Sequence, residues 1–118
     1  MSEIAYIVLP MPPTTNNLFA GNGKRRYRTA KYKSWAKEAG LMLMLQQPPQ
    51  YRGQVCVHLF VGEPKNERDM DLANREKAAI DLLVEHQIIQ GDGRKYVRRI
   101  IMDWAAIEGI EIKISEFP

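Results

Sequence analysis

The sequence has few of the residues that cross-link a chain or anchor it to a membrane. Its 118 residues include one cysteine, Cys56, so no disulfide can form within the chain. Cys56 lies in an apolar run, which predicts an inert core thiol. No apolar run approaches the roughly 18 residues of a membrane span, and the first residues lack the basic-then-apolar pattern of a secretion signal. We therefore expect a cytoplasmic protein with no membrane partner.

Histidine is also scarce, which limits the kinds of metal site. The two histidines are His58 and His86. Neither has a second ligand residue at the short spacing typical of zinc sites. We interpret both as structural residues.

Positive charge is in small excess, but it is unevenly distributed. Lys and Arg number 17 against 14 Asp and Glu, so net charge alone does not predict nucleic-acid binding. The cations gather in two blocks: Lys24, Arg25, Arg26, Arg28, Lys31 and Lys33, and then Arg94, Lys95, Arg98 and Arg99. Such blocks either bind phosphates or are solvated surface segments. Two such blocks beside an acidic segment keep both alternatives open.

Hydrophobic patterning predicts one α+β domain over residues 1–118, since a hydrophobic fraction of 45% is ordinary for a globular protein. Strands are expected at residues 4–10, 55–61, 96–105 and 110–116, and helices at residues 30–46 and 74–87. The basic loop 21–26 is expected at the tip of a further hairpin. This order predicts a small mixed β-sheet with two main helices packed against it.

Two finer expectations concern the strands. The first strand has apolar residues on both faces, which favours an inner position in the sheet. The last two strands flank Glu108 and Gly109, which is typical of a hairpin.

Acidic residues gather where a charged loop meets the second helix. Asp71 precedes this helix, and Asp69 lies two residues before Asp71. Asp92 lies between two glycines, which permit a tight turn and the close approach of a ligand. Lys77 and Asp81 are four residues apart and so are neighbours on one helical face.

These residues have two interpretations. In the first, they are a helix cap, a turn aspartate and a surface ion pair. In the second, the carboxylates bind Mg²⁺, which takes few carboxylates and completes its octahedron with water and phosphate oxygens. Lys77 would then hold the scissile phosphate or stabilise its charge, as in a metal-dependent phosphodiesterase.

The chain resembles the RusA family of Holliday-junction resolvases, found in bacteria and their phages. The residues that carry the resemblance run through nearly the whole chain: Leu9-Pro10-Met11-Pro12-Pro13, Asn16-Asn17, the acidic segment before Lys77-Ala78-Ala79-Ile80-Asp81-Leu82-Leu83, the turn at Asp92, and the final strand pair.

The resemblance implies a small homodimeric endonuclease, encoded by host or phage. Such an enzyme makes paired nicks in four-way DNA junctions with Mg²⁺ or Mn²⁺. Three aspartates and a helical lysine form the family's usual catalytic set. Asn74, Lys77 and Asp81 fix the register, so Asp71 takes the first acidic position and Asp92 the third.

The second acidic position falls on Ala73, which cannot bind a metal. Three accounts are open: a deliberate Asp→Ala change, a natural loss that leaves a DNA-binding protein, or replacement by the pair Asp69 and Asp71. The first is favoured because Asn74 and Lys77 keep their places around a single change.

The resemblance thus implies a natively active resolvase, impaired in this chain at Ala73. Its metal ligands would be Asp71 and Asp92, with Asp69 and Asp81 as auxiliary candidates and Lys77 as the catalytic lysine. The expected DNA contacts are Asn16, Asn17, Lys24, Arg25, Arg26 and Arg28. The alternatives are a non-catalytic junction-binding protein and a structural module whose acids form caps and ion pairs.

Overall fold

The computed structural model describes residues 2–65 and 70–118. The elements are β1 (Glu3–Leu9), η1 (Thr15–Asn17), β2 (Phe19–Ala20), η2 (Gly23–Arg25), β3 (Tyr27–Arg28), α1 (Ala30–Gln46), β4 (Val55–Gly62), η3 (Leu72–Arg75), α2 (Glu76–Glu85), β5 (Val97–Ala105) and β6 (Ile110–Glu116), where η marks a short 3₁₀-helix. Their order confirms the predicted α+β class.

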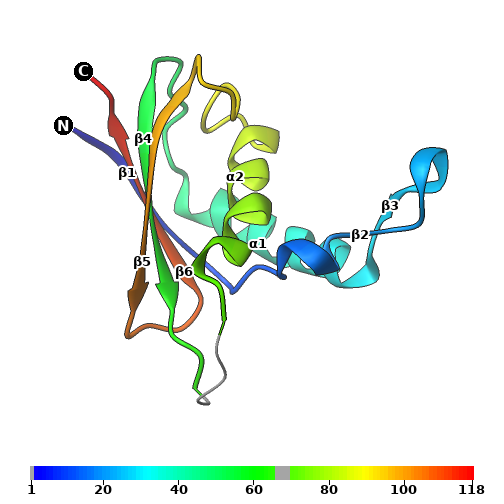
Figure 1. Ribbon diagram of the computed structural model, residues 1–118. Coiled ribbons are helices and arrows are strands. Elements are labelled where there is room, and N and C mark those ends of the chain that lie inside the picture. Colours follow the sequence, from blue (N-terminus) through cyan, green and yellow to red (C-terminus); the bar gives the residue numbers. More distant parts are fainter. Residues whose placement is uncertain (1, 66–69) are drawn as a thin grey trace.

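One four-stranded mixed sheet forms the centre of the molecule. Its strand order is β1-β6-β4-β5, with β4 parallel to β5 and the other two pairs antiparallel. Both helices lie on the same face of this sheet (Figure 1). The predicted arrangement of a mixed sheet covered by two helices is therefore confirmed.

The expected hairpin between the last two strands is wrong. β4 lies between β5 and β6, so Leu59 pairs with Met102 on one side and with Ile112 on the other. The physical reason is the composition of β4, whose residues are apolar on both faces and nearly all buried. Such a strand is most stable at the centre of a sheet, whereas the exposed charges of β5 suit an edge.

The inner position expected for the first strand is also wrong, because β1 is the other edge of the sheet. Ile7 faces the helices and is fully buried, while Tyr6 and Val8 on the opposite face are 46% and 41% exposed. The free edge is partly covered by Gln46 of α1. The Val8 N–H donates to Gln46 Oε1 at 2.8 Å, and Gln46 Nε2 donates to the Val8 carbonyl at 2.7 Å.

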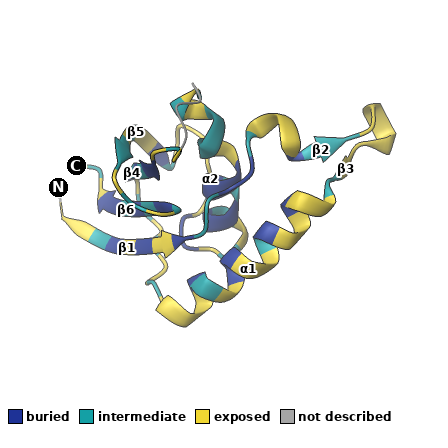
Figure 2. Cartoon of the chain, turned by 90° about the horizontal axis from the view of Figure 1, so that it is seen from below, coloured by how far each residue is buried: buried dark blue, intermediate teal, exposed yellow. Residues whose placement is uncertain are grey.

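The core lies between the sheet and the two helices. Leu43 of α1, Leu83 of α2 and Ile112 of β6 are among its fully buried side chains. Each helix turns its buried side to the sheet and its exposed side outward (Figure 2). Thr29 caps α1 by accepting a hydrogen bond from the Tyr32 N–H at 3.1 Å, as predicted. Cys56 is buried, which confirms its assignment to the core.

The basic loop forms the predicted hairpin. β2 and β3 pair antiparallel, with Phe19 opposite Arg28. This hairpin projects away from the four-stranded sheet, beyond the start of α1 (Figures 1 and 2). Within residues 2–65 and 70–118, no helix is long and apolar enough to cross a membrane.

Candidate active site

The acidic segment enters the second helix through a 3₁₀ turn. α2 begins at Glu76, two residues later than predicted, and η3 precedes it. Asp71 is the N-cap residue of η3, but its side chain makes no capping hydrogen bond. Only its backbone carbonyl caps, accepting from the Asn74 N–H at 3.2 Å. The interpretation of the Asp71 carboxylate as a helix cap is therefore wrong, and this exposed group is available to a ligand.

Asp71 shares a groove with the asparagines after β1. The groove has a volume of about 550 Å³ and is lined by Pro13, Thr14, Asn16, Asn17, Lys31, Pro64, Lys65, Met70, Asp71, Asn74 and Arg75. Thr15 donates a hydrogen bond of 3.3 Å to the Asn74 carbonyl and so links η1 to η3. Two sequence-predicted groups, Asn16-Asn17 and Asp71, thus meet on one surface although more than fifty residues separate them.

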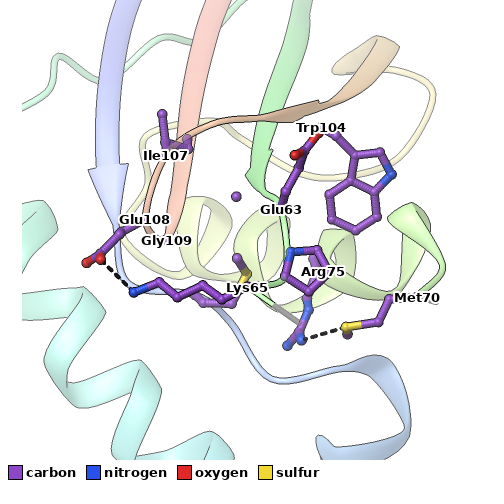
Figure 3. Close-up of a pocket in the computed structure, with 11 residues that line it drawn as sticks. Glu63, Lys65, Met70, Arg75, Trp104, Ile107, Glu108 and Gly109 are labelled. Atoms are coloured by element: carbon purple, nitrogen blue, oxygen red, sulfur yellow. Dashed lines mark hydrogen bonds and ion pairs between the residues drawn. The ribbon is translucent and has the colours of Figure 1, made fainter. Parts of the chain in front are cut away.

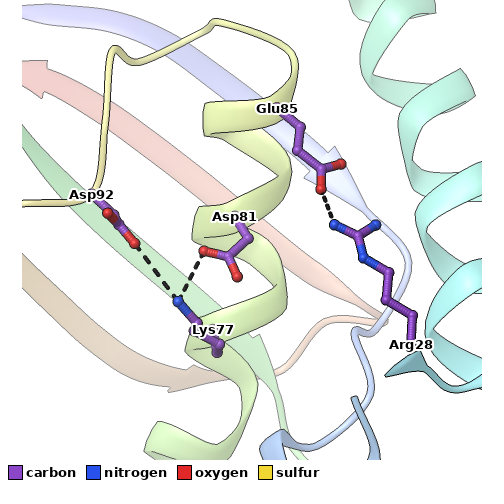
Figure 4. A network of polar contacts seen from close by, with 5 residues as sticks. All are labelled: Arg28, Lys77, Asp81, Glu85 and Asp92. Atoms are coloured by element: carbon purple, nitrogen blue, oxygen red, sulfur yellow. Dashed lines mark hydrogen bonds and ion pairs between the residues drawn. The ribbon is translucent and has the colours of Figure 1, made fainter. Parts of the chain in front are cut away.

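Lys77 connects the helix to the second acidic turn. Its Nζ lies 3.1 Å from Asp81 Oδ1 and 3.7 Å from Asp92 Oδ2. Figure 4 shows the two carboxylates approaching this one amine from α2 and from the turn before β5. The hydrogen bond to Asp81 raises the pKa of Lys77 above its ordinary value, and the charge of Asp92 adds to this effect. Lys77 is half exposed, so its charge can reach a bound phosphate.

Ala73 lies in a second hollow, next to this lysine. The hollow has a volume of about 320 Å³ and is lined by Thr15, Leu18, Phe19, Arg26, Ala73, Glu76 and Lys77. Because the hollow also contains Lys77 and Arg26, a carboxylate in place of the Ala73 methyl group would face positive charge. Ala73, where the resemblance implies an aspartate, and the predicted catalytic lysine thus line the same hollow.

The cations of the first basic block have different surroundings. Arg26 stacks on the Phe19 ring, with Cζ 4.3 Å from the ring centroid. Arg28 donates to the Glu85 carboxylate, as Figure 4 shows, and its pKa is raised by that bond. Lys24 and Arg25 are exposed in η2, at the tip of the projecting hairpin. Of the block, Arg26 thus lies in the hollow of Ala73, and Arg28 is already paired.

No complete metal cage is present in the described part of the chain. Residues 2–65 and 70–118 contain no group of three His, Cys, Asp or Glu side chains placed to hold a metal ion. The auxiliary candidate Asp69 lies outside the described residues. Asp71 and Asp92 are exposed carboxylates, and such oxygen donors fit a largely hydrated Mg²⁺. They do not fit a metal that needs a closed set of protein ligands.

Arg75 is a further residue of this region that no sequence pattern singled out. It donates to the Pro12 carbonyl, and its guanidinium lies 4.0 Å from the Met70 sulfur. Burial lowers its pKa. Arg75 thereby holds the proline-rich segment against η3. Its position directly after Asn74 was the one available signal.

Arg75 also lines a neighbouring cavity of about 340 Å³ between the ends of β4 and β5. Figure 3 shows Trp104 on one side of it and an ion pair at its rim, in which Lys65 lies 3.0 Å from Glu108. None of the residues predicted as ligands or DNA contacts lines this cavity. This cavity therefore shares lining residues with the groove of Asp71 but contains none of the predicted site residues.

Comparison with known proteins gives one result. No curated protein sequence matches this chain significantly. The family model of endodeoxyribonuclease RusA matches residues 10–115 of the 118. The matched region contains the asparagines after β1, the acidic segment, Lys77 and the turn of Asp92. The chain therefore belongs to the RusA family, whose members in general are Holliday-junction resolvases.

Proposed function

We propose that this chain binds four-way DNA junctions as a homodimer, and that its fully active form cuts two opposed strands with Mg²⁺, or with Mn²⁺ in its place. The observation that carries the proposal is the convergence of Lys77, Asp92 and the hollow of Ala73, beside a groove that holds the uncapped Asp71. Carboxylates that can hold a metal ion, together with one amine, suit a phosphodiester, whose single negative charge is shared by two oxygens.

Each residue has a proposed role. Asp71 and Asp92 offer carboxylate oxygens to the metal, which when bound supplies an activated water and offsets charge on the leaving oxygen. Lys77 holds a phosphate oxygen through its protonated amine. Asp81 orients Lys77 through their 3.1 Å contact, and Asp69 remains an auxiliary ligand.

DNA binding is proposed for the surface beside these residues. Asn16 and Asn17 line the groove with Asp71 and can bond to phosphate or sugar oxygens. Lys24 and Arg25 carry exposed charge at the hairpin tip, and Arg26 extends it towards Lys77. Arg28 also contacts the DNA when its guanidinium leaves the Glu85 carboxylate and binds a phosphate instead.

We further propose that Ala73 impairs the cleavage step in this chain. With alanine there, the described carboxylates that can face the metal are Asp71 and Asp92, and Mg²⁺ is held by fewer protein oxygens. Restoring the carboxylate tests the whole proposal. Nicking of a synthetic four-way junction with Mg²⁺ is measured for this chain, for Ala73→Asp, and for Ala73→Asn as the uncharged control of nearly the same shape.

The expected result is cleavage by the Ala73→Asp variant at least about a hundredfold faster than by either other protein, because one metal or charge contact in a transition state is typically worth that much. Equal cleavage by all three would assign the missing ligand to Asp69 and remove the role proposed for position 73. Junction binding without cleavage by any of them would contradict the nuclease proposal.

A second function is supported by the donor set itself. Because the described residues contain no three-ligand cluster, a non-catalytic protein that binds junctions is consistent with the same surface. It predicts junction affinity that does not depend on Mg²⁺ and an absence of nicking by the Ala73→Asp variant.

A further inference from the structure

The second basic block lies at the end of the sheet opposite the β5–β6 loop, beside two aromatic rings. Arg98 and Arg99 lie at the start of β5, and both guanidinium groups approach Phe117, with Cζ at 6.0 Å and 5.2 Å from the ring centroid. Lys95 lies beside Tyr96, with Nζ 5.7 Å from that ring. Arg94 precedes them, and all four cations are exposed. We call these four residues the β5 basic cluster.

A β-bulge explains why two successive residues reach the same ring. Val55 pairs with Val97, but the next residue, Cys56, pairs with Arg99, so Arg98 is the extra residue. In a regular strand Arg98 and Arg99 would point to opposite faces of the sheet. A bulge turns the strand locally and here brings both cations to Phe117.

The backbone beneath the cluster is held by hydrogen bonds from three segments. The Tyr96 and Val97 N–H groups both donate to the Gly93 carbonyl, at 2.9 and 3.0 Å. Gln54 donates to the Lys95 carbonyl at 3.3 Å, and its own carbonyl accepts from the Phe117 N–H at 2.9 Å. The backbone of the cluster is thus fixed before any ligand binds, which lowers the backbone entropy lost on binding.

The four charges have no counter-ion among residues 2–65 and 70–118. None of the ion pairs found there involves Arg94, Lys95, Arg98 or Arg99. Among the same residues, one hydrogen bond is made by these side chains, from Arg98 to the Arg94 carbonyl at 3.1 Å. Uncompensated like charges repel one another in the free protein, so an added polyanion relieves this repulsion.

We propose that the β5 basic cluster is a second phosphate-binding surface, which holds the backbone of a duplex DNA arm. This inference rests on the proposed function. The cluster starts two residues after Asp92, on the turn that is closed by the Gly93 carbonyl, so DNA bound at Asp92 lies near its first residues. Guanidinium groups match phosphate geometry, and a DNA backbone offers several phosphates to several cations at once.

The experiment compares this chain with the double variant Arg98→Gln/Arg99→Gln, which keeps the long side chains and removes two charges. The control is Lys37→Gln, which removes an exposed charge from α1 outside both basic blocks. The affinity for plain duplex and for a four-way junction is measured over a series of salt concentrations, with polyglutamate as a second polyanion. Circular dichroism checks that all three proteins melt at the same temperature.

We expect the slope of log affinity against log salt to fall by about 2 for the Arg98/Arg99 variant, on duplex and junction alike, and to stay unchanged for the control. Affinity at moderate salt should fall about tenfold or more for the variant alone. An unchanged slope in a protein that binds junctions would overturn the inference and leave the proposed function intact. Equal binding of polyglutamate, lost in the same variant, would also overturn it in favour of an acidic protein partner.

The two proposals can fail separately. If this chain binds duplex through the cluster but shows neither junction preference nor nicking in any Ala73 variant, the proposed function fails and the cluster stands. If the chain binds no DNA at low salt, both proposals are overturned.

Discussion

The charge state of Lys77 follows from the two carboxylates that contact it. Its amine contacts the carboxylates of Asp81 and Asp92, and the contact with Asp81 raises its pKa from 10.5. A raised lysine pKa means that the folded protein favours the charged form. The resulting stability is fully present below the unfolded pKa and is lost only as the pH rises through the higher folded value. Lys77 therefore stays protonated throughout the neutral range.

The prediction for this residue concerns DNA binding at different pH. Lys77→Met should weaken junction binding by about tenfold, and the ratio to the unchanged protein should be constant from about pH 6 to about pH 9. Fluorescence anisotropy with labelled junction measures it, and Lys37→Met on α1 is the control. A ratio that shrinks towards pH 9 would show that Lys77 loses its charge there, contrary to its position between two carboxylates.

At the scale of elements, α1 is joined to the sheet by more than its apolar face. Tyr32, Trp35 and Leu43 bury one side of the helix, while Gln46 in its last turn bonds to both backbone groups of Val8 on the edge strand. An edge strand otherwise leaves such groups open to water or to another chain. The end of α1 thus satisfies two backbone groups of β1 that a neighbouring strand would otherwise bond.

Replacing Gln46 tests this contact. Gln46→Ala should lower the free energy of unfolding by about 1 kcal/mol, because exposed hydrogen bonds contribute modestly. Urea denaturation measures the change, and hydrogen exchange at the Val8 amide should speed up. Gln50→Ala, at an exposed residue with no side-chain hydrogen bond in the described structure, is the control. Equal losses for the two variants would mean that the Gln46 contact contributes nothing.

At the scale of the whole molecule, each chain carries one set of proposed site residues. Asp71, Lys77 and Asp92 lie on the helix side of the sheet and its adjoining loops, so one chain can face one strand at a time. Paired cleavage of a four-way junction therefore needs two chains, and a two-fold dimer would present two equal sites to two equivalent strands.

We accordingly predict a homodimer in solution. Sedimentation equilibrium should give twice the mass of one chain, without DNA and over a range of dilutions. The Lys77→Met variant should give the same mass, because the lysine belongs to the site rather than to the contact between chains. A monomer that still binds junctions would contradict the two-site arrangement.

Much of this protein could be predicted from local sequence patterns. Alternating or continuous apolar residues located the strands, and Thr29 before a helical apolar face located α1 to the residue. The acidic segment and Lys77 were singled out by residue type and spacing, whereas the role expected of position 73 came from the resemblance; the family match covers these residues. The strands and α1 depend on neighbours within a few positions, which is the range over which capping and periodicity act.

Other features were decided only by the tertiary structure. The sequence of the last two strands is typical of a hairpin, yet β4 lies between them. The reason is that β4 is buried on both faces, which favours the centre of the sheet. Local spacing likewise suggested that Asp71 caps a helix, while in the fold its carboxylate makes no capping hydrogen bond and Asp71 lines a groove. The approach of Arg99 to Phe117 depends on which strands pair, and the contact of Lys77 with Asp92 depends on how the chain folds back after α2. Strand pairing is set by burial over the whole chain, and that sum cannot be read from any one segment.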